Sequence, residues 1–200
     1  MTARVDWAFF SALAGLLGAL TFAFMWSAAV VTDGHWILGQ ETLSELGGDR
    51  PGRSFFNAAV ITEGILGLIF SSGIYRLMKG NNLGRLGSMV FFIGAIALIG
   101  VGIFPITTGS PHTVASYAFF GLMLIALLLM IAPIFHHPVL GKVGGVVTIA
   151  SLIVSLGFLF AAPIPPTEAV AVICLLIWSS AQSLLIIFNR RKMGFVYISR

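Results

Sequence analysis

The chain has 200 residues, of which 58% are apolar and 9% are charged, with a formal net charge of +4. Soluble domains carry about 25% charged residues, so a soluble fold could not cover this much apolar surface. The basic residues gather near the ends of apolar runs, which indicates a topology signal, and we expect no nucleic-acid partner.

Six apolar runs, each long enough to cross a bilayer, follow one another along the chain. They cover residues 7–31, 55–77, 86–106, 114–135, 143–163 and 168–188. The first run shows no small-residue cleavage site, so we expect an uncleaved anchor rather than a signal peptide. The pattern predicts an all-α fold in which residues 1–200 form a single domain, an integral membrane bundle of six transmembrane helices surrounded by the lipid bilayer.

Lysine and arginine are unequally divided between the two sides of the predicted bundle. Of the 11 basic residues, only Arg50 and Arg53 lie on the side away from the termini. The other side holds Arg4, Arg76, Lys79, Arg85, Lys142, Arg190, Arg191, Lys192 and Arg200. The positive-inside rule therefore predicts a multi-pass protein of the cell membrane with both termini in the cytoplasm.

The connector 32–54 follows the first run on the predicted outer side. Within it, Trp36 to Leu46 is predicted to form a short interfacial helix that ends at Gly47. The connector would fold over the outer end of the bundle.

Helical spacing in this connector puts Glu41, Ser44 and Glu45 on one face. One interpretation is a solvated polar face that pairs with Arg50 and Arg53. The other is an acidic site for a cation or for the polar head of a lipid or substrate.

Glu63 lies inside the apolar run from Phe55 to Tyr75. A carboxyl group at membrane depth is costly and normally faces a partner, a cavity or the bundle interior. We expect Glu63 to be the only charged residue deep in a span. Its role is either a hydrogen bond between helices or a part in proton relay, ligand binding or catalysis.

Further polar side chains are expected near the same predicted surface. Asn57 begins the second run, and His112 lies beside the turn after Pro105. His35 and His112 could approach the carboxylates named above, a combination suited to acid–base chemistry or a metal. Because no H-x-x-x-H or H-E-x-x-H spacing occurs, no metal site is predicted, and a structural hydrogen bond from His112 is favoured.

Small and polar residues in the later runs indicate close contact between helices. The glycines are Gly84, Gly87, Gly94, Gly100 and Gly102 in the third run, and Gly141, Gly144, Gly145 and Gly157 in the fifth. They favour a compact bundle or, equally, the face of a homo-oligomer.

The sixth run adds polar residues that we interpret as interhelical hydrogen-bonding groups: Trp178, Ser179, Ser180, Gln182 and Ser183. An offset of 57 residues relates 83–87 to 140–144, which indicates a parallel hairpin repeat or a shared preference of helix starts.

Several ordered motifs resemble the pattern of the domain-of-unknown-function 998 family. They are Ser44-Glu45-Leu46-Gly47, Phe56-Asn57, Gly64, Gly102-Ile103-Phe104-Pro105, and His112 with Ala115. The resemblance implies a prokaryotic integral membrane protein of about six helices and implies no established activity. A more distant, topological likeness is to the Frag1/DRAM/Sfk1 type of lipid-linked membrane proteins.

These observations favour a protein that binds a lipid or small amphiphile in a pocket open to the outer leaflet. The alternatives are an intramembrane lipid-modifying enzyme that uses Glu63 and His112, and a small proton-coupled transporter or channel. The candidate ligand-binding residues are Glu63, His112, Asn57, Ser44, Glu45, Glu41 and His35. The sequence indicates neither a reaction nor a cofactor.

Overall fold

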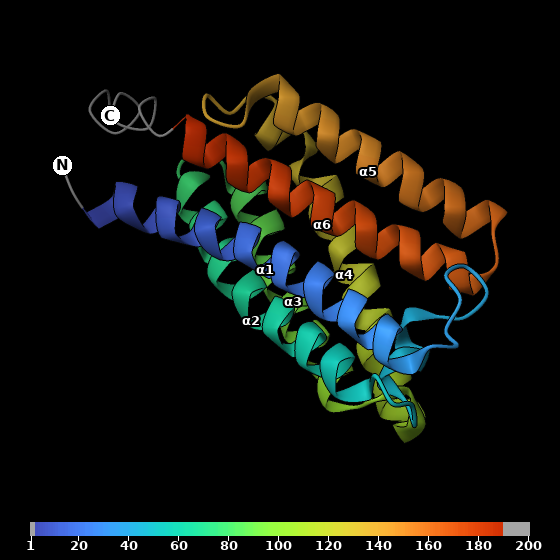
Figure 1. The fold of residues 1–200 in the computed structure, drawn as a ribbon. Coiled ribbons are helices and arrows are strands. Elements are labelled where there is room, and N and C mark those ends of the chain that lie inside the picture. The colour runs from blue at the N-terminus through green and yellow to red at the C-terminus, as the bar shows by residue number, and fades with distance from the viewer. Residues whose placement is uncertain (1–2, 190–200) are drawn as a thin grey trace.

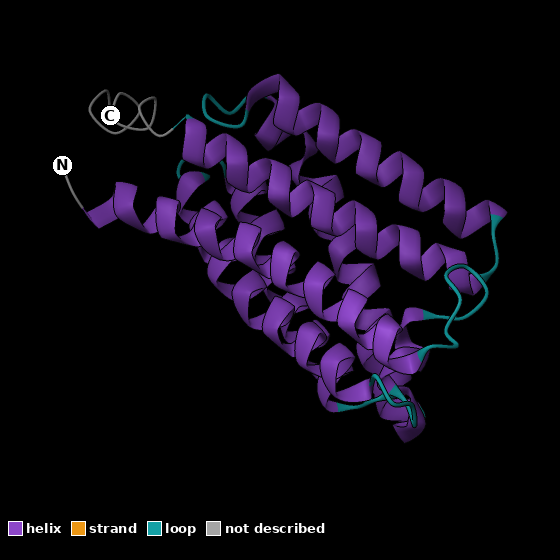
Figure 2. Cartoon of the chain, viewed as in Figure 1, coloured by secondary structure: helices purple, strands orange, loops and turns teal. Residues whose placement is uncertain are grey.

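The computed structural model describes residues 3–189, and their side chains from Trp7 onward. Long helices dominate this part of the chain (Figure 2). They are α1 (Ala3–Asp33), α2 (Arg53–Leu77), α3 (Asn82–Ile103), α4 (Ser110–Phe135), α5 (Gly141–Ala161) and α6 (Ile164–Phe188). Two short 3-10 helices, η1 (Leu43–Gly47) and η2 (Ile106–Thr108), lie in the connectors.

All six α-helices are long and apolar enough to cross a membrane, which confirms the predicted all-α class and helix number. Their starts differ from the prediction. The helices α3, α4 and α6 each begin four residues earlier than expected. In α3 the Asn81 side chain accepts the Gly84 N–H at 2.8 Å and so caps the new start. In α6 the first turn holds Pro165, a position where the missing N–H of proline has no cost.

The helices form a ring in which each contacts its neighbours in chain order, and α6 closes the ring against α1 (Figure 1). We call the end with Gly34–Gly52, Ile106–Gly109 and Ala162–Pro163 the loop end. The opposite end, where α1 begins and α6 ends, is the terminal end.

The cytoplasmic placement of the termini stays a prediction. Part of its basis lies outside the described residues, namely Arg190, Arg191, Lys192 and Arg200 and the side chain of Arg4.

Glycines in α3 hold this helix close to both neighbours. A Cβ atom at Gly87 would lie 3.2 Å from a backbone oxygen of α4, and one at Gly102 would lie 2.9 Å from a backbone oxygen of α2. The predicted role in helix packing is confirmed at these positions. In α5 the prediction is wrong for Gly157, which faces open space, and for Gly141, whose φ of +59° serves the turn before the helix. A homo-oligomer and the 57-residue repeat stay predictions.

The connector after α1 differs from the expected interfacial helix over Trp36–Leu46. The chain turns at Gly34 and Gly39, whose φ values of +73° and +81° are left-handed and interrupt a helix. Only η1 is helical, and its Leu43 and Leu46 side chains are buried against the bundle at 1% and 0% exposure. The connector therefore folds into the loop end of the bundle rather than along a membrane surface.

Candidate functional site

A pocket lies inside the ring, in the half nearer the loop end. Counted out to its open side, and so including space open to the surroundings, it comprises about 730 Å³ that no atom occupies. Four long helices each line it with one face, on which residues recur every three or four positions. These faces are Phe56, Val60, Glu63 and Gly67 of α2; Phe91, Ala95, Leu98 and Val101 of α3; Ser116, Phe119, Phe120 and Met123 of α4; and Glu168, Val172, Leu175, Leu176 and Ser179 of α6. Phe22 of α1 and Leu43 and Ser44 of η1 complete the wall, and α5 contributes no residue.

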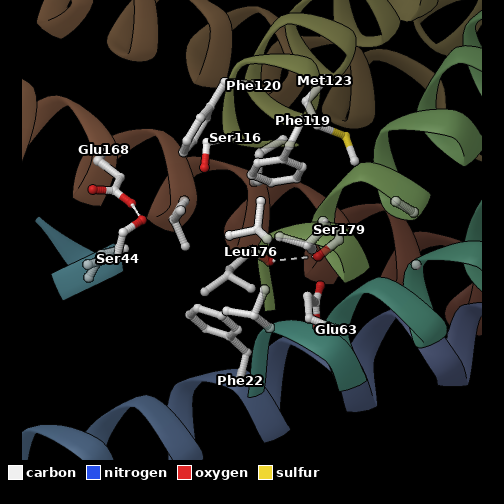
Figure 3. Close-up of a pocket in the computed structure, with 18 of the residues that line it drawn as sticks. Phe22, Ser44, Glu63, Ser116, Phe119, Phe120, Met123, Glu168, Leu176 and Ser179 are labelled. Atoms are coloured by element: carbon white, nitrogen blue, oxygen red, sulfur yellow. Dashed lines mark hydrogen bonds between the residues drawn. The ribbon is translucent and has the colours of Figure 1, made fainter. Parts of the chain in front are cut away.

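The wall is apolar except for two glutamates and three serines (Figure 3). The polar lining residues are Ser44, Glu63, Ser116, Glu168 and Ser179. All lining residues belong to the described part of the chain, and none of them is lysine, arginine or histidine. The pocket therefore contains carboxyl groups without a basic side chain in its wall.

Glu63 occupies the deeper part of the pocket, where Figure 3 shows its side chain beside Ser179. Its Oε2 atom is shielded from solvent and has no hydrogen-bond partner among the described residues. It lies against Gly18 of α1, where a Cβ atom would approach Oε2 to 2.5 Å. The structure thus gives no support to the interpretation of Glu63 as an interhelical hydrogen bond. Sequence reasoning missed Gly18, whose lack of a side chain leaves room for the carboxyl group.

Glu168 lies nearer the loop end, and its Oε1 accepts a hydrogen bond from Ser44 Oγ at 2.6 Å. This bond joins η1 to α6. Glu168 was expected at the start of the sixth span, whereas it lies in the second turn of α6, which begins at Ile164. That Glu63 is the only charged residue deep in a span stays a prediction. The two prolines at 165 and 166 could have signalled the earlier start. Eleven residues of α6 separate Glu168 from Ser179, about 16 Å at 1.5 Å per residue.

His112 lies behind the pocket wall rather than in it. Its Nδ1 is 2.8 Å from the Phe104 carbonyl oxygen, and its Nε2 is 3.2 Å from Ser116 Oγ. A neutral ring that donates through Nδ1 and accepts at Nε2 satisfies both contacts. The predicted structural hydrogen bond of His112 is confirmed, and this histidine does not meet Glu63.

The acidic face predicted at the connector is an ion-paired network. Glu41 pairs with Arg50, whose Nη1 also lies 3.3 Å from Asp33 Oδ1. The hydrogen bond from Arg50 to Glu41 and the negative charges of Glu41 and Asp33 raise the pKa of the Arg50 guanidinium. Arg53 pairs with Asp49 at 3.3 Å. The interpretation as a paired polar face is confirmed for Glu41 with Arg50.

The remaining candidates stabilise the connector or face outward. Glu45 Oε2 accepts the Thr42 N–H at 2.6 Å, which caps η1. Asn57 Nδ2 donates to the Gly47 carbonyl at 3.0 Å and ties η1 to α2. His35 is exposed. Of the seven predicted candidates, the structure places only Glu63 and Ser44 in the pocket wall.

An aromatic cluster closes the pocket toward the terminal end. The rings of Phe70, Phe91 and Trp178 lie 5.5–6.1 Å apart, centroid to centroid. Trp178 Nε1 donates to Thr148 Oγ1 at 2.9 Å, and Gln182 Nε2 donates to the Gly144 carbonyl at 3.0 Å. The predicted interhelical hydrogen bonding of the sixth span is confirmed at Trp178 and Gln182.

Metal ligands do not gather at the pocket or elsewhere in the described range. Among these residues, no group of three or more His, Cys, Asp or Glu side chains is placed to hold a metal ion.

Six apolar helices in a ring define a multi-pass helical membrane protein. A family model described as protein of unknown function (DUF998) matches residues 16–187, and the chain belongs to this family. No curated protein and no solved structure matches the chain.

Proposed function

We propose that the protein binds a lipid or small amphiphile in the pocket, with the loop end in the outer half of the cell membrane and the termini in the cytoplasm. The observation that carries this proposal is an apolar-walled pocket with carboxyl groups at two levels. An acyl chain in such a cavity gains about 0.8 kcal/mol for each buried CH₂ group.

The pocket is placed to receive its ligand from the side. Both α4 and α6 line it, and α5 packs against both without reaching it. In Figure 1 the loop-end portion of α4 lies well apart from α5. We propose that the entrance lies between the loop-end parts of α4 and α6, which both line the pocket, so that a molecule dissolved in the bilayer reaches it without crossing water.

Two observations favour binding over the alternatives. A lipid-modifying enzyme that uses Glu63 and His112 needs both groups at one reacting atom, yet His112 is behind Ser116 and bonded to Phe104. A transporter or channel needs a path beyond Glu63, yet the aromatic cluster fills that level, with Phe70 and Trp178 each 1% exposed.

Native mass spectrometry of gently solubilised protein tests the proposal. The pocket is filled by Val172→Phe, and Val146→Phe makes the same change on the outer face of α5, where Val146 is 57% exposed. We expect wild type and Val146→Phe to retain an amphiphile that Val172→Phe loses. Equal retention by all three proteins, or bare protein in every case, would contradict the proposal.

A further inference from the structure

We propose that the preferred occupant is an amphiphilic amine whose head donates hydrogen bonds to the Glu63 carboxyl group. This inference rests on the proposed function, because it names the ligand class of the same pocket. It selects against lipids with phosphate or carboxylate heads.

The first support is the unfilled hydrogen-bonding capacity of Glu63. A buried carboxyl group is costly unless it receives a donor or a counter-charge. The Ser179 hydroxyl, which is close in Figure 3, donates instead to the Leu176 carbonyl at 3.1 Å. Gly18 on the other side has no side chain to offer. A ligand head in the pocket is the remaining source of a donor.

The second support is the charge of the wall. Two carboxyl groups line the pocket, and none of its lining residues is basic. The ring of His112, the basic side chain behind Ser116, already makes hydrogen bonds at both nitrogens. His112 interacts electrostatically with Glu168, so the basic side chain near the pocket already has an acidic partner. An anionic head would add a further acceptor beside two carboxyl groups, whereas an ammonium head brings donors and a positive charge to Glu63.

The third support is the difference between the two carboxyl groups. Glu168 already accepts the Ser44 hydroxyl, so the head has more to gain at Glu63. Between the two levels the wall is apolar, with Val60, Phe119 and Val172 among its residues. The amine head therefore lies at Glu63, and its chain extends along the apolar wall toward the loop end.

Gly18 provides a way to move the carboxyl group without removing it. The Cβ atom of Gly18→Ala would lie 2.5 Å from Glu63 Oε2, which is the tip of a flexible side chain. The glutamate shifts most, and α2 gives by a few tenths of an ångström at Leu66, whose Cβ atom would lie 3.3 Å from the new methyl group. A matched control is Gly157→Ala in α5, where the new methyl group meets open space.

The experiment titrates purified protein with a single-chain alkylamine and with the alcohol and the carboxylic acid of the same chain length. Binding is measured by native mass spectrometry at neutral pH. We expect wild type to bind the amine at least about 10-fold more tightly than the acid, because a hydrogen bond to a charged group has this effect. The variant Glu63→Gln should lose this preference and still bind the alcohol, which shows that the protein is folded. Gly18→Ala should weaken amine binding, and Gly157→Ala should leave it unchanged.

Failure of the inference and failure of the proposed function give different results. If wild type binds the acid as tightly as the amine, and Val172→Phe abolishes both, the pocket binds amphiphiles and the amine preference is wrong. If Glu63→Gln keeps the full amine preference, Glu63 does not receive the head. If no probe binds, or Val172→Phe binds all probes like wild type, the pocket is not the binding site and both proposals are overturned.

Discussion

The two halves of the bundle are built from the same helices but filled differently. Toward the terminal end, the largest side chains are fully enclosed, among them Trp178, Met130 and Ile134, each at 1% exposure or less. Toward the loop end, the same helices leave a pocket of about 730 Å³. A cavity lowers stability because its lining loses contacts. The terminal half therefore supplies most of the tight packing between the helices, and the loop half can hold a pocket.

Removal of the largest enclosed ring should give the greatest loss of stability. Trp178→Ala creates a cavity and removes the shorter of the two hydrogen bonds to Thr148 Oγ1, so we expect a loss of about 3–5 kcal/mol. Phe119→Ala loses a ring contact with Phe120, but the space it vacates joins the existing pocket, and it should cost less than Trp178→Ala. Denaturant unfolding in detergent measures both. Equal losses would mean that the two halves do not differ as described.

The close contact of α3 with α2 provides a second test of tight packing. In Gly102→Ala the new methyl group meets a backbone oxygen of α2 at 2.9 Å, which cannot rotate away, and we expect a loss of about 1–3 kcal/mol. At Gly157 the same change meets open space and should stay within about 0.5 kcal/mol of wild type. Thermal unfolding distinguishes them, and a Gly102→Ala protein as stable as the control would refute close packing at this contact.

A smaller and more local effect is expected at the loop end. Ser44→Ala removes the hydrogen bond to Glu168, worth about 1–2 kcal/mol, while buried Leu43 and Leu46 keep η1 in place. Hydrogen exchange should therefore rise at residues 43–47 with little change in the melting temperature. The exposed Ser54→Ala is the control. Unchanged exchange at η1 would show that this bond does not hold the segment.

The smallest effect concerns pH at the terminal end. Burial lowers the pKa of His137, whose Nε2 contacts the Leu77 carbonyl and whose Nδ1 accepts the Val139 N–H. The unfolded chain binds the proton more readily, so stability should be complete above the ordinary histidine pKa of about 6.5 and fall as the pH drops below it. Over this pH range, the melting temperature should depend less on pH in His137→Ala than in wild type. The exposed His136→Ala should keep the wild-type dependence. An identical slope in both variants would assign the pH dependence elsewhere.

The sequence predicts what depends on one segment at a time. Apolar runs long enough to span a bilayer predict the six helices, and Glu63 stands out because a carboxyl group interrupts such a run. Both predictions come from a single segment, so neither requires knowledge of how the helices pack.

The rest depends on where helices begin and which residues face each other. Glu168 was missed because a run of apolar residues does not mark the first turn of α6. The helix expected over Trp36–Leu46 failed because residue spacing does not show that Asp33 accepts the N–H of Trp36 at 3.1 Å and turns the chain. The sequence does not reveal that Gly18 makes room for Glu63, because this depends on the packing of α1 against α2.

Gly18 also determines the level along the bundle at which the Glu63 carboxyl group of α2 can lie. Four residues to either side of Gly18, α1 carries Ala14 and Phe22, which have the side chains that Gly18 lacks. A slide of α1 by one turn, about 5.4 Å, would bring one of these against Glu63. The Glu63 carboxyl group therefore keeps its level along the bundle only while α1 and α2 keep their register.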